Sequence, residues 1–185
     1  MDSAKSGAHI MVKLIVAFIL LATSQANAEF YVGLQNNSWQ DVIPVSYTNN
    51  GTPTTFYALT TFSTLSVGGG YENSFSTRWR YNADFYLHSG TADIHKIQGT
   101  VSPRKSVVSQ WISGKVNYRI SKTFSMGPQI VVNSIEVRGA GSSTSLGALI
   151  NSEIEMHQNY RLVQTFGSMN DSGTIAYTIG VQRYF

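Results

Sequence analysis

The sequence predicts an all-β protein, an eight-stranded antiparallel up-and-down transmembrane β-barrel. Three observations lead to this fold class. Apolar and polar residues alternate over many strand-length segments, charged residues make up only 12% of the chain, and large aromatic residues gather on one face of the alternating segments. Alternation with a period of two is typical of a strand with two different faces. The charged fraction is about 25% in soluble globular proteins, so this surface has few groups that require water.

The N-terminal segment predicts a secreted protein. An apolar run over residues 14–22 follows a lysine and precedes a small-residue triplet that ends at Ala28. This pattern indicates a signal peptide over residues 1–28, with translation starting at Met11 and cleavage after Ala28. The alternative, a helical membrane anchor, fits less well because a spanning helix needs about 20 apolar residues. One mature domain is expected over residues 29–185.

Eight segments of the mature chain show the alternation, and short connections between them take turns with longer ones. The predicted strands cover residues 30–40, 60–73, 76–89, 106–121, 123–135, 145–157, 160–169 and 173–185. The short connections are 73–75, 121–123 and 158–159; the others are 41–59, 90–105, 136–144 and 170–173. Short and long connections are therefore expected at opposite ends of the sheet.

Three local patterns refine this picture. Segments 42–48 and 54–60 flank a hairpin turn signal containing Gly51, so we expect the first two strands to extend beyond the membrane as a ribbon. Pro128 cannot donate a ladder hydrogen bond, and beside Gly127 it predicts a bulge in the fifth strand. The glycine triplet 68–70 predicts close packing or a bend in the second strand.

The alternation fits two barrels of opposite polarity. A soluble, lipocalin-like barrel turns its apolar face inward, whereas a membrane barrel turns it toward lipid. The aromatic residues of the apolar face are Trp79, Tyr81, Phe85, Tyr118, Phe124, Phe166, Tyr177 and Phe185. An eight-stranded interior is only wide enough for ordinary side chains to fill, so this set of rings favours the membrane barrel.

Charges on the polar face balance in number. The cations are Arg78, Arg80, Lys115 and Arg119, and the anions are Glu72, Asp84, Glu153 and Glu155. Charges that share a lumen must be paired and hydrogen-bonded, so equal numbers are expected. We predict a structural charge network near the short-turn end, centred on Arg78, Arg80, Arg119, Glu72 and Glu155. The alternative is that each is an ordinary solvated strand residue.

The chain ends on the strand Tyr177-Thr-Ile-Gly-Val-Gln-Arg-Tyr-Phe185. With the signal peptide and the eight alternating strands, this ending resembles the small outer-membrane barrels of Gram-negative bacteria, the family of OmpX and the transmembrane domain of outer membrane protein A. The resemblance implies an outer-membrane location and contact with lipid and lipopolysaccharide. It also implies that the barrel assembly machinery recognises the last strand, with Tyr177 and Phe185 as the insertion signal. Arg183 departs from the aromatic residue usual at the third position from the end.

Aromatic girdles are expected at both membrane interfaces. The girdle at the short-turn end is predicted to contain Trp79, Tyr81, Tyr118, Tyr160 and Phe185. The one at the opposite end is predicted to contain Tyr47, Phe56 and Tyr57.

No motif in the sequence indicates catalysis, a metal or a cofactor. His88 and Ser89 are adjacent, which in a strand sends them to opposite faces, and His95 with Asp93 gives only two metal ligands. His157 is better explained as a lumenal histidine. With a net charge of +3 and no basic run longer than Arg104-Lys105, nucleic acid is not an expected partner.

We therefore expect a monomeric, non-enzymatic outer-membrane barrel with a plugged polar lumen and external loops that serve a structural, adhesive or recognition role. The alternatives are a narrow pore, a lipid A deacylase or acyltransferase, and a soluble periplasmic binding protein.

Overall fold

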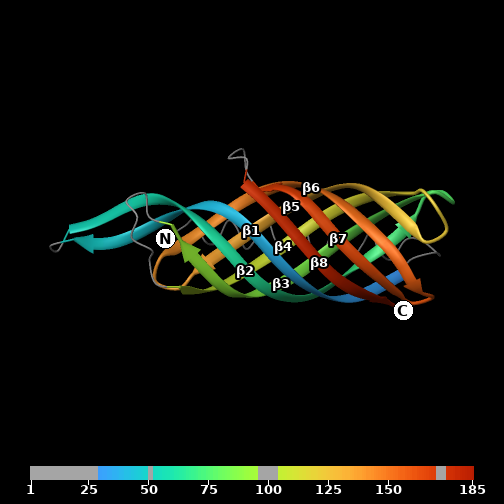
Figure 1. Ribbon diagram of the computed structural model, residues 1–185, viewed down its shortest axis with the longest axis horizontal. Helices are drawn as coiled ribbons and strands as arrows, with labels where there is room; N and C mark the ends of the chain where they lie inside the picture. Colours follow the sequence, from blue (N-terminus) through green and yellow to red (C-terminus); the bar gives the residue numbers. More distant parts are fainter. Residues whose placement is uncertain (1–28, 50–51, 96–103, 170–173) are drawn as a thin grey trace, which may run out of the picture.

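Eight antiparallel strands close into a barrel in which every strand pairs with its neighbours in the sequence and β8 pairs with β1 (Figure 1). The computed structural model describes residues 29–49, 52–95, 104–169 and 174–185. The strands are β1 Glu29–Asn49, β2 Thr52–Ser74, β3 Trp79–Ile94, β4 Lys105–Arg119, β5 Phe124–Val137, β6 Gly141–His157, β7 Tyr160–Met169 and β8 Thr174–Tyr184. The predicted all-β, eight-stranded, up-and-down barrel is confirmed.

The first two strands are much longer than the others and leave the barrel as a ribbon. β1 pairs with β8 only as far as Trp39, and β2 pairs with β3 only from Thr60. Beyond these points β1 and β2 pair with each other, up to Asn49 opposite Thr52. Figure 1 shows this ribbon extending past the rest of the barrel, at the end opposite the C-terminus. The predicted hairpin is confirmed, and its tip lies outside the described residues.

The outer surface of the barrel is apolar. Leu34, Leu65, Ile130 and Leu146 each expose about 60% of their surface, whereas the residues that alternate with them are buried. On β6 the outward apolar face runs from Leu146 to Met156. Ten residue steps of about 3.3 Å, tilted by about 40°, give a band about 25 Å tall, which matches the apolar band of membrane barrels.

Charges on the outer surface of the described residues stay near the ends of the strands. At the short-turn end they are Arg78, Lys122 and Arg183, and at the other end Asp93, Arg104, Lys105, Glu136 and Arg138. Glu29 lies at the lumen rim, 3.8 Å from Arg161. The described part of the chain contains no helix long and apolar enough to cross a bilayer.

Aromatic rings surround the short-turn end over β1 to β4. Trp79 lies 4.9 Å from Tyr118 and 6.2 Å from Phe75, and Phe75 lies 6.3 Å from Tyr81 between ring centroids. Tyr71 continues the row, 6.4 Å from Tyr81. Aromatic rings of this kind anchor a barrel at the headgroup level.

The second girdle differs from the prediction. Phe56 lies on the inward face of β2 and packs against buried apolar residues, because its parity is that of Ala58 and Phe62. Tyr57 is exposed on the ribbon, and the side chain of Tyr47 lies outside the described part of the structure.

The bulge predicted at Pro128 is wrong. Lys115 pairs with Gln129 and Tyr118 pairs with Met126, so the register between β4 and β5 is the same on both sides of Gly127 and Pro128. The ladder is interrupted for two pairs, since proline has no N–H to donate, but no extra residue is inserted.

Candidate functional site: a charged lumen beneath an apolar plug

Six charged side chains from five strands meet inside the short-turn half of the barrel. They are Glu72 of β2, Arg80 and Asp84 of β3, Lys115 of β4, Glu153 of β6 and Arg161 of β7, and all are buried. Each occupies an inward position of its strand, so the period of two brings them together without any loop. We refer to these six residues as the lumenal charge network.

Glu153 and Glu72 hold the network together. One carboxylate oxygen of Glu153 lies 2.9 Å from Lys115 Nζ, and the other lies 3.5 Å from both Arg80 Nη2 and Arg161 Nη1. Glu72 accepts from Arg161 at 2.6 Å and from Arg80 at 3.1 Å. The two carboxylates therefore link strands that lie on opposite sides of the barrel.

The network continues toward both ends of the lumen. Above Glu153, Lys115 lies 3.7 Å from Asp84, which also accepts a hydrogen bond from Ser113 at 3.1 Å. At the short-turn rim, Arg119 pairs with Glu155 at 3.2 Å, and both side chains are partly exposed. Together the rim pair and the six buried groups contain four cations and four anions.

Seven of the eight charged residues predicted for the lumen lie in this group, and Arg78 does not. Arg78 falls in the turn before β3 begins at Trp79, where strand parity no longer applies. Its side chain is exposed and donates to the Tyr118 hydroxyl at 2.8 Å on the outer surface. Arg161 takes its place in the charge balance. Sequence reasoning missed Arg161, although its parity, opposite to that of Leu162 and Phe166, could have identified it.

A large tyrosine ring crosses the lumen next to the network. The Tyr86 hydroxyl accepts a hydrogen bond from Gln182 at 3.0 Å. A Cβ placed on Gly33 would lie 2.5 Å from that hydroxyl, and one on Gly68 would lie 2.6 Å from the ring. The glycines of β1 and β2 therefore make room for Tyr86, which confirms the close packing predicted for the glycine triplet.

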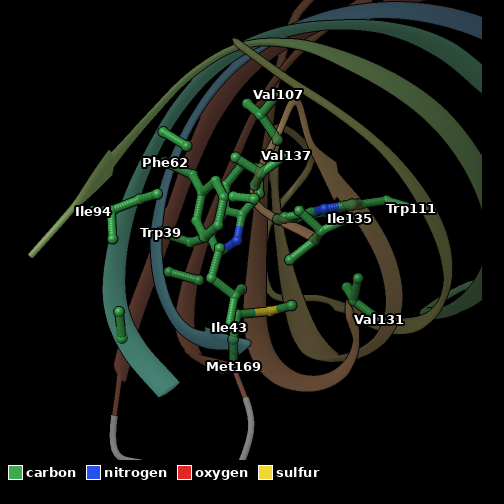
Figure 2. Close-up of a cluster of buried hydrophobic side chains, with 14 of the residues drawn as sticks. Trp39, Ile43, Phe62, Ile94, Val107, Trp111, Val131, Ile135, Val137 and Met169 are labelled. Atoms are coloured by element: carbon green, nitrogen blue, oxygen red, sulfur yellow. The ribbon is translucent and has the colours of Figure 1, made fainter. Parts of the chain in front are cut away.

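The half of the lumen near the long connections is mainly apolar, although Asp41, Asn133 and His88 are also buried there. Its fully buried side chains include Trp39, Ile43, Phe62, Ile94, Val107, Trp111, Val131, Ile135, Val137 and Met169, which we call the apolar plug (Figure 2). Trp39 stacks on Phe62 at 4.8 Å and meets Trp111 edge-on at 5.4 Å. His88 lies 4.7 Å from the Trp111 ring and is buried with it. The sequence predicts a plugged polar lumen; in this half mainly apolar side chains fill the lumen instead.

The base of the ribbon closes the mouth of the barrel above the plug. Ile43, Val45 and Ala58 are buried although they lie beyond the part of β1 and β2 that pairs with the barrel. A Cβ on Gly141 would lie 2.7 Å from the carbonyl oxygen of Pro44, so the ribbon rests against the start of β6. Figure 2 shows Ile43 of the ribbon close to Met169 of β7.

Between the network and the plug lies a cavity of about 10 Å³, lined by Asp84, Tyr86, Trp111, Lys115 and Asn151 among others. This volume is about that needed for one water molecule. Among the described residues, the charge network and the apolar plug thus occupy the lumen on either side of this cavity.

The histidines considered in the sequence lie in separate surroundings, and His157, predicted to be lumenal, is exposed at the end of β6. His88 is buried inside, whereas Ser89 is on the outer surface. His95 bonds to Thr61 at 3.0 Å, while Asp93 pairs with Arg104 at 3.0 Å. Within the described ranges, no group of three or more His, Cys, Asp or Glu side chains could hold a metal ion.

The end of the chain places Tyr177 and Phe185 on the outer surface, whereas Tyr184 points into the lumen, where its hydroxyl bonds to Glu72. Tyr177 is 43% and Phe185 67% exposed, and the Phe185 N–H donates to the Phe30 carbonyl at 2.9 Å. The Arg183 guanidinium lies 5.0 Å from the Phe185 ring and 5.8 Å from the Tyr160 ring. This cation is therefore held among rings at the short-turn interface rather than in the apolar band.

No protein-family model and no curated protein matches the sequence. Among solved structures, the chain is similar to Ail, the attachment invasion locus protein of Yersinia pestis, with 13% identity over 86% of this chain and 99% of Ail and a TM-score of 0.45. It is similar to Neisserial surface protein A with 14% identity, the same two coverages and a TM-score of 0.44. It is also similar to the outer membrane protein OprG from Pseudomonas aeruginosa, with 12% identity over 86% of this chain and 96% of that one and a TM-score of 0.47.

Proposed function

We propose that the chain is an integral β-barrel of the bacterial outer membrane, with a plugged lumen and an external ribbon and loops that serve a structural, adhesive or recognition role. The observation that carries the proposal is the polarity of the closed barrel. Large apolar side chains cover its outer surface while paired charges fill its lumen. A closed barrel also leaves no unpaired strand edge in hydrocarbon, which is a requirement for crossing a bilayer.

The filled lumen argues against a narrow pore. An ion would have to pass the charge network and then the apolar plug, and the cavity between them is water-sized in the described part of the chain. We expect purified protein in planar bilayers to show no steady conductance.

The last strand is proposed to direct insertion. Tyr177 and Phe185 project from the outer surface of β8, where the barrel assembly machinery could bind them before closure against β1. Lipid and lipopolysaccharide are the proposed surroundings, and no catalytic role is proposed.

Outer-membrane fractionation combined with gel mobility before and after boiling tests this proposal. A folded barrel resists SDS until it is heated, so the unheated protein should migrate faster than the boiled one. Recovery in the soluble periplasmic fraction without this shift would contradict the proposal. Mass spectrometry of lipid A from cells that express the protein would reveal a lipid A enzyme by a changed acyl pattern.

A further inference from the structure

Two neighbouring short turns form a basic groove at the end of the barrel opposite the ribbon. The groove has a volume of about 420 Å³ and is lined by Thr77, Arg78, Arg119, Ile120, Ser121 and Lys122. Its size falls within the range of small-ligand sites, about 300–1,000 Å³. Three of its six lining residues are cations and two carry hydroxyl groups, so its chemistry suits a phosphate.

Two of the cations have no carboxylate partner among the described residues. Arg78 donates to the neutral Tyr118 hydroxyl, and among the described residues neither Arg78 nor Lys122 lies within 4.0 Å of a carboxylate oxygen. Arg119 differs, because it pairs with Glu155 at the lumen rim. A groove with unpaired positive charge attracts an anion.

The two turns are held rigidly. The Ser76 hydroxyl accepts from the N–H groups of Arg78 and Trp79 at 3.2 and 3.0 Å. The Ser121 hydroxyl accepts in the same way from Thr123 and Phe124 at 3.3 and 3.1 Å.

A backbone hydrogen bond of 2.7 Å from Arg119 N–H to the Arg78 carbonyl joins one turn to the other. The groove is therefore formed before any ligand arrives, which lowers the entropic cost of binding.

The groove lies at the depth of lipid headgroups. Trp79 and Tyr118, 4.9 Å apart, belong to the aromatic girdle directly beside it, and Ile120 in its lining exposes 55% of its surface. Such rings mark the membrane interface. From this position and charge we infer that the basic groove binds the phosphate of an anionic phospholipid headgroup. The inference rests on the proposed membrane location, with the short turns on the phospholipid side.

Native mass spectrometry of the folded mature barrel tests the inference in micelles that contain equal amounts of phosphatidylglycerol and phosphatidylcholine. The wild-type protein should retain phosphatidylglycerol preferentially. The double variant R78Q/K122Q should reduce this preference about 10- to 30-fold, since each cation near a membrane surface contributes about fivefold.

Three matched variants serve as controls. R78K/K122R keeps both charges and should keep the preference. Arg138→Gln removes one exposed cation at the opposite end and should leave it unchanged. Lys122→Gln alone should lower it about fivefold and serves in place of the double variant if that one fails to show the heat-dependent mobility shift.

Inorganic phosphate in micelles of phosphatidylcholine alone separates the lipid from a soluble anion. Phosphate that binds as tightly as the lipid would overturn the inference, as would a double variant that retains its lipid preference. A wild-type barrel that fractionates with the outer membrane and shifts on heating, yet shows no preference, would refute the headgroup site while leaving the proposed function intact.

Discussion

The two halves of the lumen are closed by opposite kinds of side chain. In the short-turn half, six buried charges neutralise one another, whereas in the half near the ribbon tryptophan, phenylalanine and aliphatic side chains pack together. The outer surface changes in the opposite sense. Where the lumen is charged, the outside is apolar, and where the lumen is apolar, the outside carries Ser38, Gln40, Ser63 and Ser134.

This inversion follows from the solvent on each side. Within the bilayer the outer face meets hydrocarbon, so polar groups turn inward and must satisfy one another. Beyond the bilayer the outer face meets water, and the same strands bury their apolar side chains as a soluble barrel does. The level at which the pattern inverts marks the outer edge of the proposed membrane band, and the exposed rings of Tyr177 and Phe166 lie beside Ser38 near this level.

Of the substitutions that distinguish the two halves of the lumen, Glu153→Gln should cause the largest loss in the free energy of unfolding. The change leaves Arg80, Lys115 and Arg161 with one fewer anion in a buried site, and removing one partner of a buried pair costs about 3–5 kcal/mol. Urea unfolding of the barrel in lipid vesicles measures the loss. The double variant K115M/E153Q restores neutrality and should recover part of it. A single variant as stable as the wild type would show that the network does not hold the short-turn half together.

Replacing Trp39 by alanine should destabilise the half with the apolar plug, with a slightly smaller loss in the free energy of unfolding. A buried tryptophan contributes about 3–5 kcal/mol, and we expect about 3 kcal/mol because water can enter the vacated space from the mouth. The same unfolding experiment applies, with Tyr57→Ala on the exposed ribbon as a control that should change little. Bilayer conductance should stay at zero, because the lumenal charge network still fills the lower lumen. Steady conductance would show that the apolar plug alone blocks the passage of ions.

Strand parity predicted much of this architecture and failed where the surroundings change along a strand. Alternation identified all eight strands and the outward rings such as Phe85 and Phe166, because the membrane imposes one polarity over most of each strand. It gave no warning of the apolar plug, since Trp39 and Trp111 share their parity with polar lumenal residues nearer the short turns. Near the long connections the outward positions become serine or threonine, and this change could have indicated that the lumen is apolar there.

The position of a single charged side chain was harder to predict than the polarity of a whole strand face. Arg78 was predicted inside because the predicted strand 76–89 begins three residues before β3, and in the turn there its side chain lies on the outer surface. Which cation bonds to which anion depends on the shear of the closed barrel. A local pattern therefore predicted the number of lumenal charges but not the central place of Arg161.

Two arginine substitutions on the outer face of β5 locate the membrane boundary. Ile130 and Ser134 are both exposed and lie four residues apart on the outer face, Ile130 in the apolar band and Ser134 where the surface is polar. Arginine near the bilayer midplane costs about 2–4 kcal/mol, and near the interface about 0–1 kcal/mol. Ile130→Arg should therefore destabilise the barrel by about 2–3 kcal/mol in vesicles and Ser134→Arg by less than about 1 kcal/mol. Equal losses would contradict the placement of the band.

The smallest effect is expected at the rim of the charged half. Arg119 and Glu155 form a 3.2 Å pair, but their side chains are 39% and 29% exposed, so water and salt screen the attraction. Arg119→Gln should cost less than about 1 kcal/mol, and the cost should shrink further between low salt and 1 M salt. Glu153→Gln should keep most of its effect over the same range, because that carboxylate is fully buried. Parallel unfolding of the two variants at both salt concentrations measures the difference, and an equal response to salt would mean that water reaches Glu153 as freely as it reaches the rim.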